Sequence, residues 1–489
     1  MTKLPPSYLE PLPGAFYPAS APLPFSRADF GPDFHWGASA AAYQTEGAWQ
    51  HQGKGPSIWD DFTRRKGTIR RNEHGRVAAD FYHRYEADLD LAAGLGLSDF
   101  RCSAAWSRVL PAGTGPVNRR GLDYYDRLVD ACLERDLRPL LTLYHWDLPS
   151  ALQARGGWTN RDIVHWFADY AQLMARRLGD RVPSWCVLNE PMVFVGAGHL
   201  LGIHAPGRRH LGAFLAAAHH ATLAQAEGGR ALRALLPKTA RIGTTFSCSH
   251  LTPHRPGNAY DEAATRRADA LLNRFFVEPT LGLGYPVAEL PALRWLLDRY
   301  QKPGDEQRMR FDFDFWGVQN YTREVVKFSP WLPLQWAALV SARQRGVPHT
   351  DMGWEVYPES IYYMLKQFAA YPNAPTLMVT ESGAAFPDVV QDGRVVDTAR
   401  RAYLQAAIGQ VLRARQEGVD VGGYFAWSLT DNFEWAEGYG PRFGLIHVDY
   451  ETQERTVKDS GRWYQEFLGG AAVANGAEEP LRADANPLS

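Results

Sequence analysis

The stretch DIVHWFADYAQLMARRLGDRVPSWCVLNE, residues 162–190, contains an amphipathic segment, a short apolar run and a final carboxylate. Residues 162–178 have the apolar spacing of a helix that buries one face. Residues 185–189 are apolar almost throughout, which is typical of a strand buried on both faces. The stretch therefore predicts a helix that leads into a strand of a parallel sheet.

The same alternation of strand and helix recurs along residues 29–470. Short apolar or β-branched runs predict further strands at 35–40, 99–104, 139–144, 242–246, 315–321, 377–380 and 423–427. Amphipathic segments predict helices between them, at 80–95, 121–134, 211–236, 399–417 and 459–468. This series of βα units, with no GxGxxG motif after the first strand, favours a closed (β/α)8 TIM barrel over an open doubly wound sheet.

Chain length leaves the number of domains open. The 489 residues would suggest about three domains of average size, but no linker-like stretch interrupts residues 29–470. We therefore expect one α/β barrel domain with long loops after its strands. Residues 1–28 are proline-rich and are expected to form an N-terminal extension; residues 471–489 are small and polar and are expected to form a flexible tail.

Charge and hydropathy argue against several classes of function. The chain has 52 basic and 54 acidic residues and a net charge of −2, and no basic run indicates nucleic-acid binding. Prolines interrupt the apolar residues near the N-terminus, so neither a signal peptide nor a membrane span is expected. The sequence predicts a cytoplasmic protein without a membrane partner, and it is compatible with a homo-oligomer.

The cysteines and histidines do not form a pattern typical of a metal or cofactor site. No HExxH motif or paired Cys/His spacing is present, so neither a metal nor a cofactor is expected. The adjacent His219 and His220 lie in an alanine-rich helical segment and are expected to be incidental. The cysteines are scattered and are expected to be buried free thiols; they are Cys102, Cys132, Cys186 and Cys248.

Polar and aromatic residues collect directly after the predicted strands, where a (β/α)8 barrel forms its active site. Glu190 ends the fourth strand and Glu381 the seventh, almost opposite each other in the ring, so these two carboxylates can flank one bond. Glycoside hydrolysis needs such a pair, because one acid protonates the leaving oxygen while one carboxylate meets the anomeric carbon. From spacing alone, structural ion pairs with Arg or Lys remain the alternative.

Ordered motifs extend this interpretation. Residues 189–191 (NEP) and 380–383 (TESG) resemble the N-E-P and T-E-N-G motifs of glycoside hydrolase family 1. Further blocks fit the same family in its order; they are YQTEGA (43–48), YHWDLP (144–149), WSLTDNFEW (427–435), RFGL (442–445) and KDS (458–460). The resemblance spans roughly residues 30–465 and implies a retaining β-glycosidase of the β-glucosidase type.

The resemblance implies a role for each carboxylate. Glu190 is expected to be the acid/base and Glu381 the nucleophile, supported by Arg101 and Tyr321. Burial and the charge of Glu381 should raise the pKa of Glu190, whereas donors should keep Glu381 ionised. Configuration should be retained, with the two carboxyl groups about 5–5.5 Å apart.

The resemblance also implies the sugar contacts. Asn189 is expected to reach the 2-hydroxyl, Trp427 to offer an apolar face to the ring, and Trp435 to add a donor. The expected partners are small-molecule β-glycosides or short oligosaccharides. The full set of implied substrate-binding residues is Gln44, His145, Trp146, Asn189, Gln319, Tyr321, Trp427, Glu434, Trp435 and Phe443.

Some residues depart from the family pattern. Ser382 and Gln319 stand where the family usually has Asn, and Val187 and Cys102 replace a common Thr and Phe. Gln319 leaves glycone preference open, because its extra methylene displaces an amide near the nucleophile. Glu434 would repel a phosphate dianion, which favours unphosphorylated glucosides, galactosides or fucosides.

Three functions stay open on the sequence. The leading one is an exo-acting β-glucosidase, for which activity on galactosides or fucosides stays open. A transglycosylase would use the same covalent intermediate with a sugar or alcohol acceptor in place of water. A non-catalytic sugar-binding barrel would be expected to have lost Glu190 or Glu381, and both are present.

Overall fold

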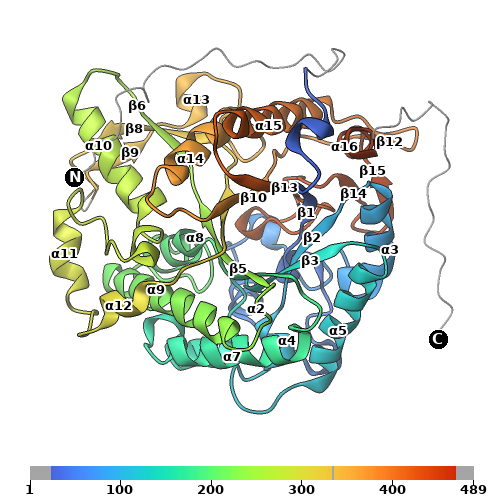
Figure 1. The fold of residues 1–489 in the computed structure, drawn as a ribbon, viewed down its shortest axis with the longest axis horizontal. Helices are drawn as coiled ribbons and strands as arrows, with labels where there is room; N and C mark the ends of the chain where they lie inside the picture. The colour runs from blue at the N-terminus through green and yellow to red at the C-terminus, as the bar shows by residue number, and fades with distance from the viewer. Residues whose placement is uncertain (1–23, 333–334, 470–489) are drawn as a thin grey trace.

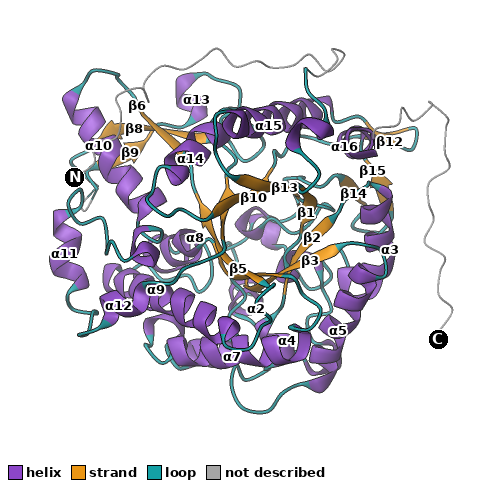
Figure 2. Ribbon diagram, viewed as in Figure 1, coloured by secondary structure: helices purple, strands orange, loops and turns teal. Residues whose placement is uncertain are grey.

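The computed structural model describes residues 24–332 and 335–469. Eight parallel strands close a barrel in the order β1-β13-β10-β7-β5-β4-β3-β2, and helices encircle it (Figures 1 and 2). The predicted (β/α)8 barrel is therefore confirmed. Most of the predicted extension, residues 1–23, and the whole predicted tail, 471–489, lie outside the described residues.

Each predicted strand corresponds to a barrel strand. The strands are β1 (His35–Ser39), β2 (Asp99–Ser103), β3 (Arg138–Tyr144), β4 (Ser184–Asn189), β5 (Arg241–Ser247), β7 (Phe315–Gln319), β10 (Thr376–Ser382) and β13 (Val421–Trp427). The boundaries differ from the prediction by one or two residues; among the largest differences, β7 ends at Gln319 rather than at 321, β10 continues to Ser382 rather than ending at 380, and β13 begins at Val421 rather than at 423. The register shifts after Val379, so that Glu381 pairs with Gln319 and the strand stays joined to its neighbour.

The helices predicted from amphipathic spacing are also present. They are α3 (Phe81–Gly94), α5 (Arg119–Leu133), α7 (Ile163–Leu178), α9 (Leu211–Arg233), α15 (Thr398–Gln416) and α16 (Asp459–Gly469). Further helices lie in connections for which no helix was predicted. They are α10 (Ala259–Asp269), α11 (Pro291–Leu297), α12 (Asp305–Met309) and α14 (Ser360–Ala369).

Short elements build up the loops after the strands. Three small sheets form there: β6 (His250–Pro253) with β8 (Arg323–Phe328) and β9 (Ala337–Leu339), β11 (Val390–Gln391) with β12 (Arg394–Val395), and β14 (Ile446–Val448) with β15 (Arg455–Val457). The short helices are α1 (Ala42–Thr45), α2 (Ile58–Thr63), α4 (Trp106–Val109), α6 (Ser150–Ala154), α8 (Pro191–Val195) and α13 (Ala342–Arg345).

Side chains fill the inside of the barrel. Large rings need space there, and glycines on neighbouring strands provide it: a Cβ at Gly37 would lie 2.4 Å from the Phe425 ring, and one at Gly243 would lie 2.4 Å from the Phe315 ring. The barrel is thus a packed core, and a ligand can bind only at its mouth. The interior cluster comprises Leu140, Cys186, Phe315, Met378 and Phe425.

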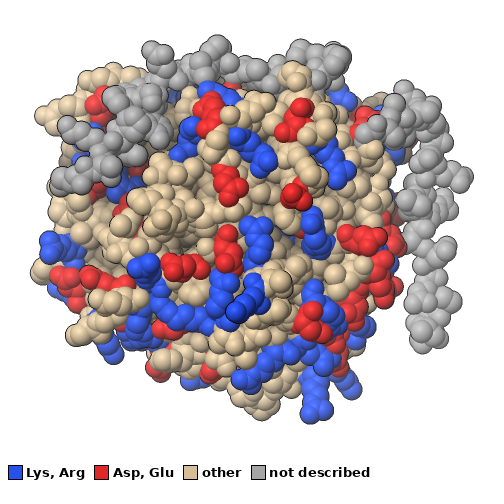
Figure 3. All heavy atoms as spheres, in the orientation of Figure 1, with Lys and Arg blue, Asp and Glu red and all other residues tan. Residues whose placement is uncertain are grey.

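The surface carries both signs of charge. Acidic and basic side chains intermingle on the face drawn in Figure 3. No helix within the described ranges has the length and apolar character needed to cross a membrane. All four cysteines are buried and free, as predicted.

Candidate active site

A cavity of about 760 Å³ opens at the carboxyl ends of the barrel strands. Most of the predicted site residues line it: Gln44, His145, Trp146, Glu190, Gln319, Tyr321, Glu381, Trp427, Glu434, Trp435 and Phe443. Arg101 and Asn189 do not line the cavity but lie buried behind its wall. The structure therefore brings together predicted site residues from seven of the eight barrel strands or the loops after them.

Glu381 is surrounded by hydrogen-bond donors. Its Oε1 accepts from Arg101 Nη1 at 2.5 Å and from Gln319 Nε2 at 2.7 Å. Its Oε2 accepts from the hydroxyl of Tyr321 at 2.6 Å. Donors of this kind stabilise the ionised form of a carboxyl.

Glu190 has far fewer partners. Its backbone adopts a left-handed conformation with φ of 46°, where β4 ends and α8 begins. The backbone N–H donates to the Thr245 carbonyl at 3.1 Å, and this contact fixes the turn. The Glu190 carboxylate receives a long contact of 3.5 Å from Asn189 Nδ2, and a hydrogen bond with the Ser247 side chain lowers its pKa against the larger effect of burial.

The two carboxyls differ in pKa for these reasons. Burial raises the pKa of Glu190 well above its ordinary value, and the negative charge of Glu381 raises it further. Burial also raises the pKa of Glu381, but the charge of Arg101 and the hydrogen bond from Tyr321 oppose this rise. Glu381 therefore ionises before Glu190, and Glu190 retains its proton to higher pH.

Asn189 links the two carboxyls. Its Oδ1 accepts from Arg101 Nη2 at 2.5 Å, from Gln319 Nε2 at 2.8 Å and from Thr245 Oγ1 at 3.1 Å. Three donors on one oxygen fix the orientation of the amide, so Nδ2 must point toward Glu190 and His145. Arg101 binds both Asn189 and Glu381, and Asn189 in turn contacts Glu190. A chain of hydrogen bonds through one guanidinium and one amide therefore connects the two acids.

This arrangement also fixes the tautomer of His145. Its Nε2 lies 3.1 Å from Asn189 Nδ2, and because Nδ2 can only donate, Nε2 must accept. Burial and the nearby Arg101 lower the pKa of His145 well below its ordinary value, so the ring is neutral and its proton is on Nδ1. Among the described residues Nδ1 has no hydrogen-bond partner, and it is therefore a free donor.

On the same side of the cavity lie free acceptors. Gln44 Nε2 donates to Asn432 Oδ1 at 3.1 Å and to the Phe433 carbonyl at 3.0 Å. Gln44 Oε1 and Glu434 Oε2 have no partner within the described part of the chain. Burial, and next the charge of Glu381, raise the pKa of Glu434 to about 8.

Aromatic rings form the rest of this wall. Trp427 and Trp435 lie with their ring centroids 6.1 and 6.0 Å from the His145 ring, and both are nearly parallel to it. Trp146 packs on Trp435 at 4.6 Å and donates from Nε1 to the Asn189 carbonyl. The Phe443 ring lies 6.0 Å from that of Tyr321. An apolar surface and unsatisfied polar groups thus face the same space, as a sugar requires.

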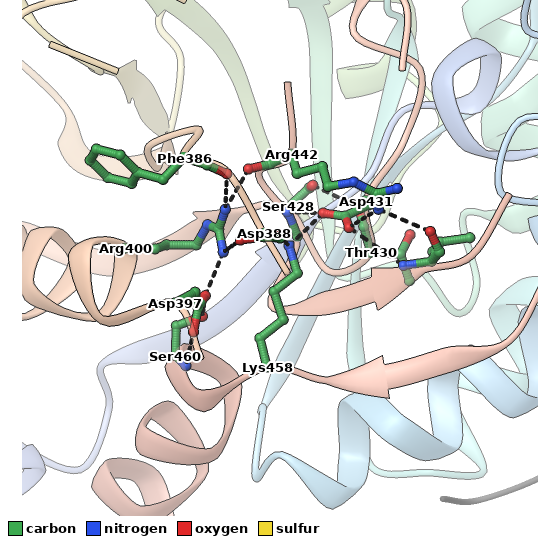
Figure 4. A network of polar contacts seen from close by, with 12 residues as sticks. Phe386, Asp388, Asp397, Arg400, Ser428, Thr430, Asp431, Arg442, Lys458 and Ser460 are labelled. Atoms are coloured by element: carbon green, nitrogen blue, oxygen red, sulfur yellow. Dashed lines mark hydrogen bonds and ion pairs between the residues drawn. The ribbon is translucent and has the colours of Figure 1, made fainter. Parts of the chain in front are cut away.

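A buried ionic network holds the loops that carry this wall (Figure 4). The Lys458 ammonium binds Asp388 and, at 2.6 Å, Asp431. Arg442 also binds Asp431 at 2.6 Å, and Arg400 binds Asp388 at 2.9 Å as well as Asp397. The loop after β10 and the loop after β13 are therefore tied to each other and to the start of α16. This network gives the family-like blocks at 442–445 and 458–460 a physical role.

Several cavity residues were not predicted. They include Ser247, Ser249, Glu324, Met352, Trp354 and Arg209. Ser247 ends β5, so the same strand-end rule that found Glu190 would have found it. Trp354 and Glu324 lie in long connections, where no sequence pattern indicated their position.

The described residues contain no group of three or more His, Cys, Asp or Glu that could hold a metal ion. His219 belongs to the adjacent histidine pair noted in the sequence. Both of its ring nitrogens are hydrogen-bonded, Nδ1 to the Tyr285 hydroxyl at 3.0 Å and Nε2 to Asp305 Oδ2 at 2.9 Å. Its role is therefore structural.

A barrel that holds two buried carboxyls in one sugar-sized cavity has the arrangement that glycoside hydrolases require. The sequence matches the family description "Glycosyl hydrolase family 1" over residues 26–471. The chain belongs to this family, and the predicted class of enzyme, a retaining β-glycosidase, is confirmed.

Known relatives agree with this assignment. Beta-glucosidase A of Thermotoga maritima is 43% identical over 441 residues, which cover 89% of this chain and 96% of the relative. The 1,4-beta-D-glucan glucohydrolase of Thermotoga neapolitana is 41% identical, with 89% and 97% covered. A solved structure, the beta-glucosidase from Thermotoga maritima in complex with deoxynojirimycin, superposes with a TM-score of 0.86 at 42% identity and covers 90% of this chain and 98% of that one.

Proposed function

We propose that the protein is a β-glucosidase that releases terminal, non-reducing β-linked glucose, with Glu190 as acid/base and Glu381 as nucleophile. The observation that carries the proposal is the contrast between the two acids. Three donors bind Glu381, and Glu190 has one long contact. Glu381 is thus the ionised carboxylate that can attack, and Glu190 is the protonated acid that can donate a proton.

The reaction proceeds by double displacement. Glu381 attacks the anomeric carbon, the bond to the leaving oxygen breaks, and the proton of Glu190 passes to that oxygen. Esterification removes the charge of Glu381, so the pKa of Glu190 falls and its carboxylate becomes a base. Glu190 then takes a proton from water, which attacks the same carbon and releases Glu381, so the configuration is retained. This chemistry requires carboxyl groups about 5–5.5 Å apart.

The sugar would bind through the unsatisfied groups of the wall. His145 Nδ1 donates to a ring hydroxyl, whereas Gln44 Oε1 and Glu434 Oε2 accept from hydroxyls. Asn189 approaches the 2-hydroxyl through Nδ2. Trp427 covers the apolar face of the ring, and Trp435 contributes its indole N–H.

Glucosides are the primary substrates in this proposal, with galactosides and fucosides as secondary ones. The relatives named beta-glucosidase and glucan glucohydrolase support glucose first. Phosphorylated sugars are excluded for a reason other than charge repulsion by Glu434, since its pKa of about 8 leaves the empty site largely neutral there. Instead, Arg442 is bound to Asp431, so it is not free to bind a phosphate.

Turnover of 4-nitrophenyl β-D-glucoside, followed by NMR of the released sugar, tests this function. Release of the β-anomer first by the wild type, and loss of turnover in Glu381→Ala, are the expected results. First appearance of the α-anomer would overturn retention. Inactivity of the wild type on a panel of β-glycosides would favour a non-catalytic sugar-binding barrel. Transfer products that dominate over free glucose at low acceptor concentration would favour the transglycosylase.

Location and assembly belong to the same proposal. We infer a cytoplasmic enzyme, because four unpaired buried cysteines fit a reducing compartment. A homo-oligomer remains compatible with the chain, and light scattering of the purified protein would determine its state.

A further inference from the structure

The strands that carry the two acids divide the ring of the barrel into two arcs. In the order β1-β13-β10-β7-β5-β4-β3-β2, Glu381 on β10 and Glu190 after β4 separate the arc of β7 and β5 from the arc of β13, β1, β2 and β3. Gln44, His145 and Trp427 belong to the larger arc and face the glycone in the proposed function. Residues from the loops after β5 and β7 therefore lie across the cavity from these three, and beyond Gln319 and Tyr321, which contact the nucleophile, they are candidates for contact with the leaving group.

Glu324 lines the cavity on this smaller arc, together with Ser249 and Thr322. It lies on β8, which pairs in parallel with β6 so that Glu324 is opposite Leu251. The preceding residue, Arg323, points away toward Glu355, which it binds at 2.8 and 2.9 Å. Since neighbouring side chains of a strand point to opposite faces, Glu324 is directed toward the cavity.

Among the described residues, Glu324 pairs with no cation. The two nearby guanidiniums both bind Glu355, because Arg345 Nη2 lies 2.6 Å from Glu355 Oε2 beside Arg323. No hydrogen bond or ion pair of the Glu324 carboxyl occurs among the described residues, whereas Glu437, another carboxyl of the cavity, pairs with Arg70 at 3.5 Å. A half-buried carboxyl without a partner is costly and is typical of a group that binds a ligand.

The electrostatic surroundings of Glu324 agree with this picture. Burial raises its pKa to about 7, the charge of Arg345 lowers the pKa, and the charge of Glu355 raises it. Near neutral pH the carboxyl thus exists in both forms, of which the ionised form accepts hydrogen bonds and the neutral form also donates one.

We infer that Glu324 is a specificity-determining residue for the leaving group, where its carboxyl hydrogen-bonds the hydroxyls of a second sugar. The inference rests on the proposed function and names its substrate class, β-linked gluco-oligosaccharides. Trp354 also lines the cavity, and its ring lies 5.3 Å from that of Tyr321. A pyranose has both hydroxyls for Glu324 and an apolar face for Trp354, whereas an aryl group offers only the latter.

Two variants test the role of Glu324, namely Glu324→Gln and Glu324→Ala. We expect kcat/KM for cellobiose to fall about 10-fold or more in Glu324→Ala, as for loss of a hydrogen bond to a charged group, and less in Glu324→Gln. The value for 4-nitrophenyl β-D-glucoside should change less than about 2-fold, because that leaving group has no hydroxyls. This second substrate also reports correct folding of the variants. Glu306→Gln, an exposed site outside the cavity, is the matched control.

The same subsite would bind an acceptor sugar. At a fixed concentration of added cellobiose, the glycosyl-enzyme of Glu324→Ala should react less often with cellobiose and more often with water. The ratio of transfer product to free glucose should therefore fall. Equal losses on cellobiose and on the aryl glucoside, or an unchanged cellobiose value, would overturn the inference while leaving the β-glucosidase proposal intact. A wild type that cleaves neither substrate would instead refute the proposed function.

Discussion

Glu190 and Glu381 are the same residue type at the ends of two barrel strands, yet they have opposite surroundings. Glu381 accepts from Arg101, Gln319 and Tyr321, whereas Glu190 receives one amide contact at 3.5 Å. Both are buried, so burial alone does not distinguish them. The positive charge of Arg101 and the donors around Glu381 favour its ionisation before that of Glu190, as the proposed roles of the two acids require.

Removal of Glu381 is expected to have the largest effect. Glu381→Ala should lower kcat by about 10⁴-fold or more, the scale found when a covalent nucleophile is lost. Steady-state turnover of 4-nitrophenyl β-D-glucoside measures the loss. A small anion such as azide, bound in the vacated space, should restore activity and give the α-glycosyl product. Retention of more than about a tenth of wild-type kcat would contradict the role of Glu381.

Removal of Glu190 should depend on the leaving group. Glu190→Gln should lower kcat/KM for an alkyl β-glucoside by about 10²- to 10⁴-fold, as expected for loss of a general acid. With 2,4-dinitrophenolate, which leaves without a proton, the fall should be much smaller. Because Glu190 must be protonated for activity, the loss of rate at high pH should also disappear in the pH profile. Equal losses for both leaving groups would argue against an acid at this position.

Removal of one hydrogen-bond donor to Glu381 should reduce the difference in pKa between the two acids. Tyr321→Phe deletes the hydroxyl that binds Glu381 Oε2, so the pKa of Glu381 should rise. Activity requires the ionised form, and the acidic limb of kcat/KM against pH should therefore move to higher pH. We expect kcat/KM to fall about 10- to 100-fold, since a hydrogen bond to a charged group contributes about 1.5–3 kcal/mol. The basic limb should stay in place, and a shift of that limb alone would contradict the assignment.

Exchange of Gln319 should have the smallest effect. Gln319→Asn removes one methylene from a side chain whose amide donates to both Glu381 and Asn189. The shorter side chain cannot hold both bonds at their present lengths, so we expect kcat/KM to change less than about 10-fold, as for one hydrogen bond. The ratio of glucoside to galactoside turnover measures whether this amide also affects glycone preference. An unchanged ratio would limit its role to the nucleophile.

Local patterns in the sequence were enough to predict the barrel and its two acids. The strands are nearly continuous apolar runs, and Glu190 follows one of them directly. The end of β10 was placed too early, because Glu381 is polar and a register shift keeps it in the ladder. Asn189 was expected to contact sugar directly; the structure places it behind the residues that line the cavity, and its contact with the 2-hydroxyl stays a prediction.

Loop residues were not predictable in the same way. Glu324 reaches the cavity because β8 pairs with β6, more than 60 residues earlier in the chain. Trp354 lies between β9 and α14, in a connection without periodic spacing. Their positions depend on contacts between distant segments, and neither helix nor strand periodicity carries that information.

The Lys458 ammonium network has a consequence for how the enzyme is made. Synthesis proceeds from the N-terminus, so every barrel strand is synthesised before Lys458. Until then Asp388 and Asp431 have their separate cations, Arg400 and Arg442, but they lack the ammonium that binds both. A nascent chain that stops before Lys458 should thus form much of the barrel without catalytic competence, so that activity appears only when synthesis is nearly complete.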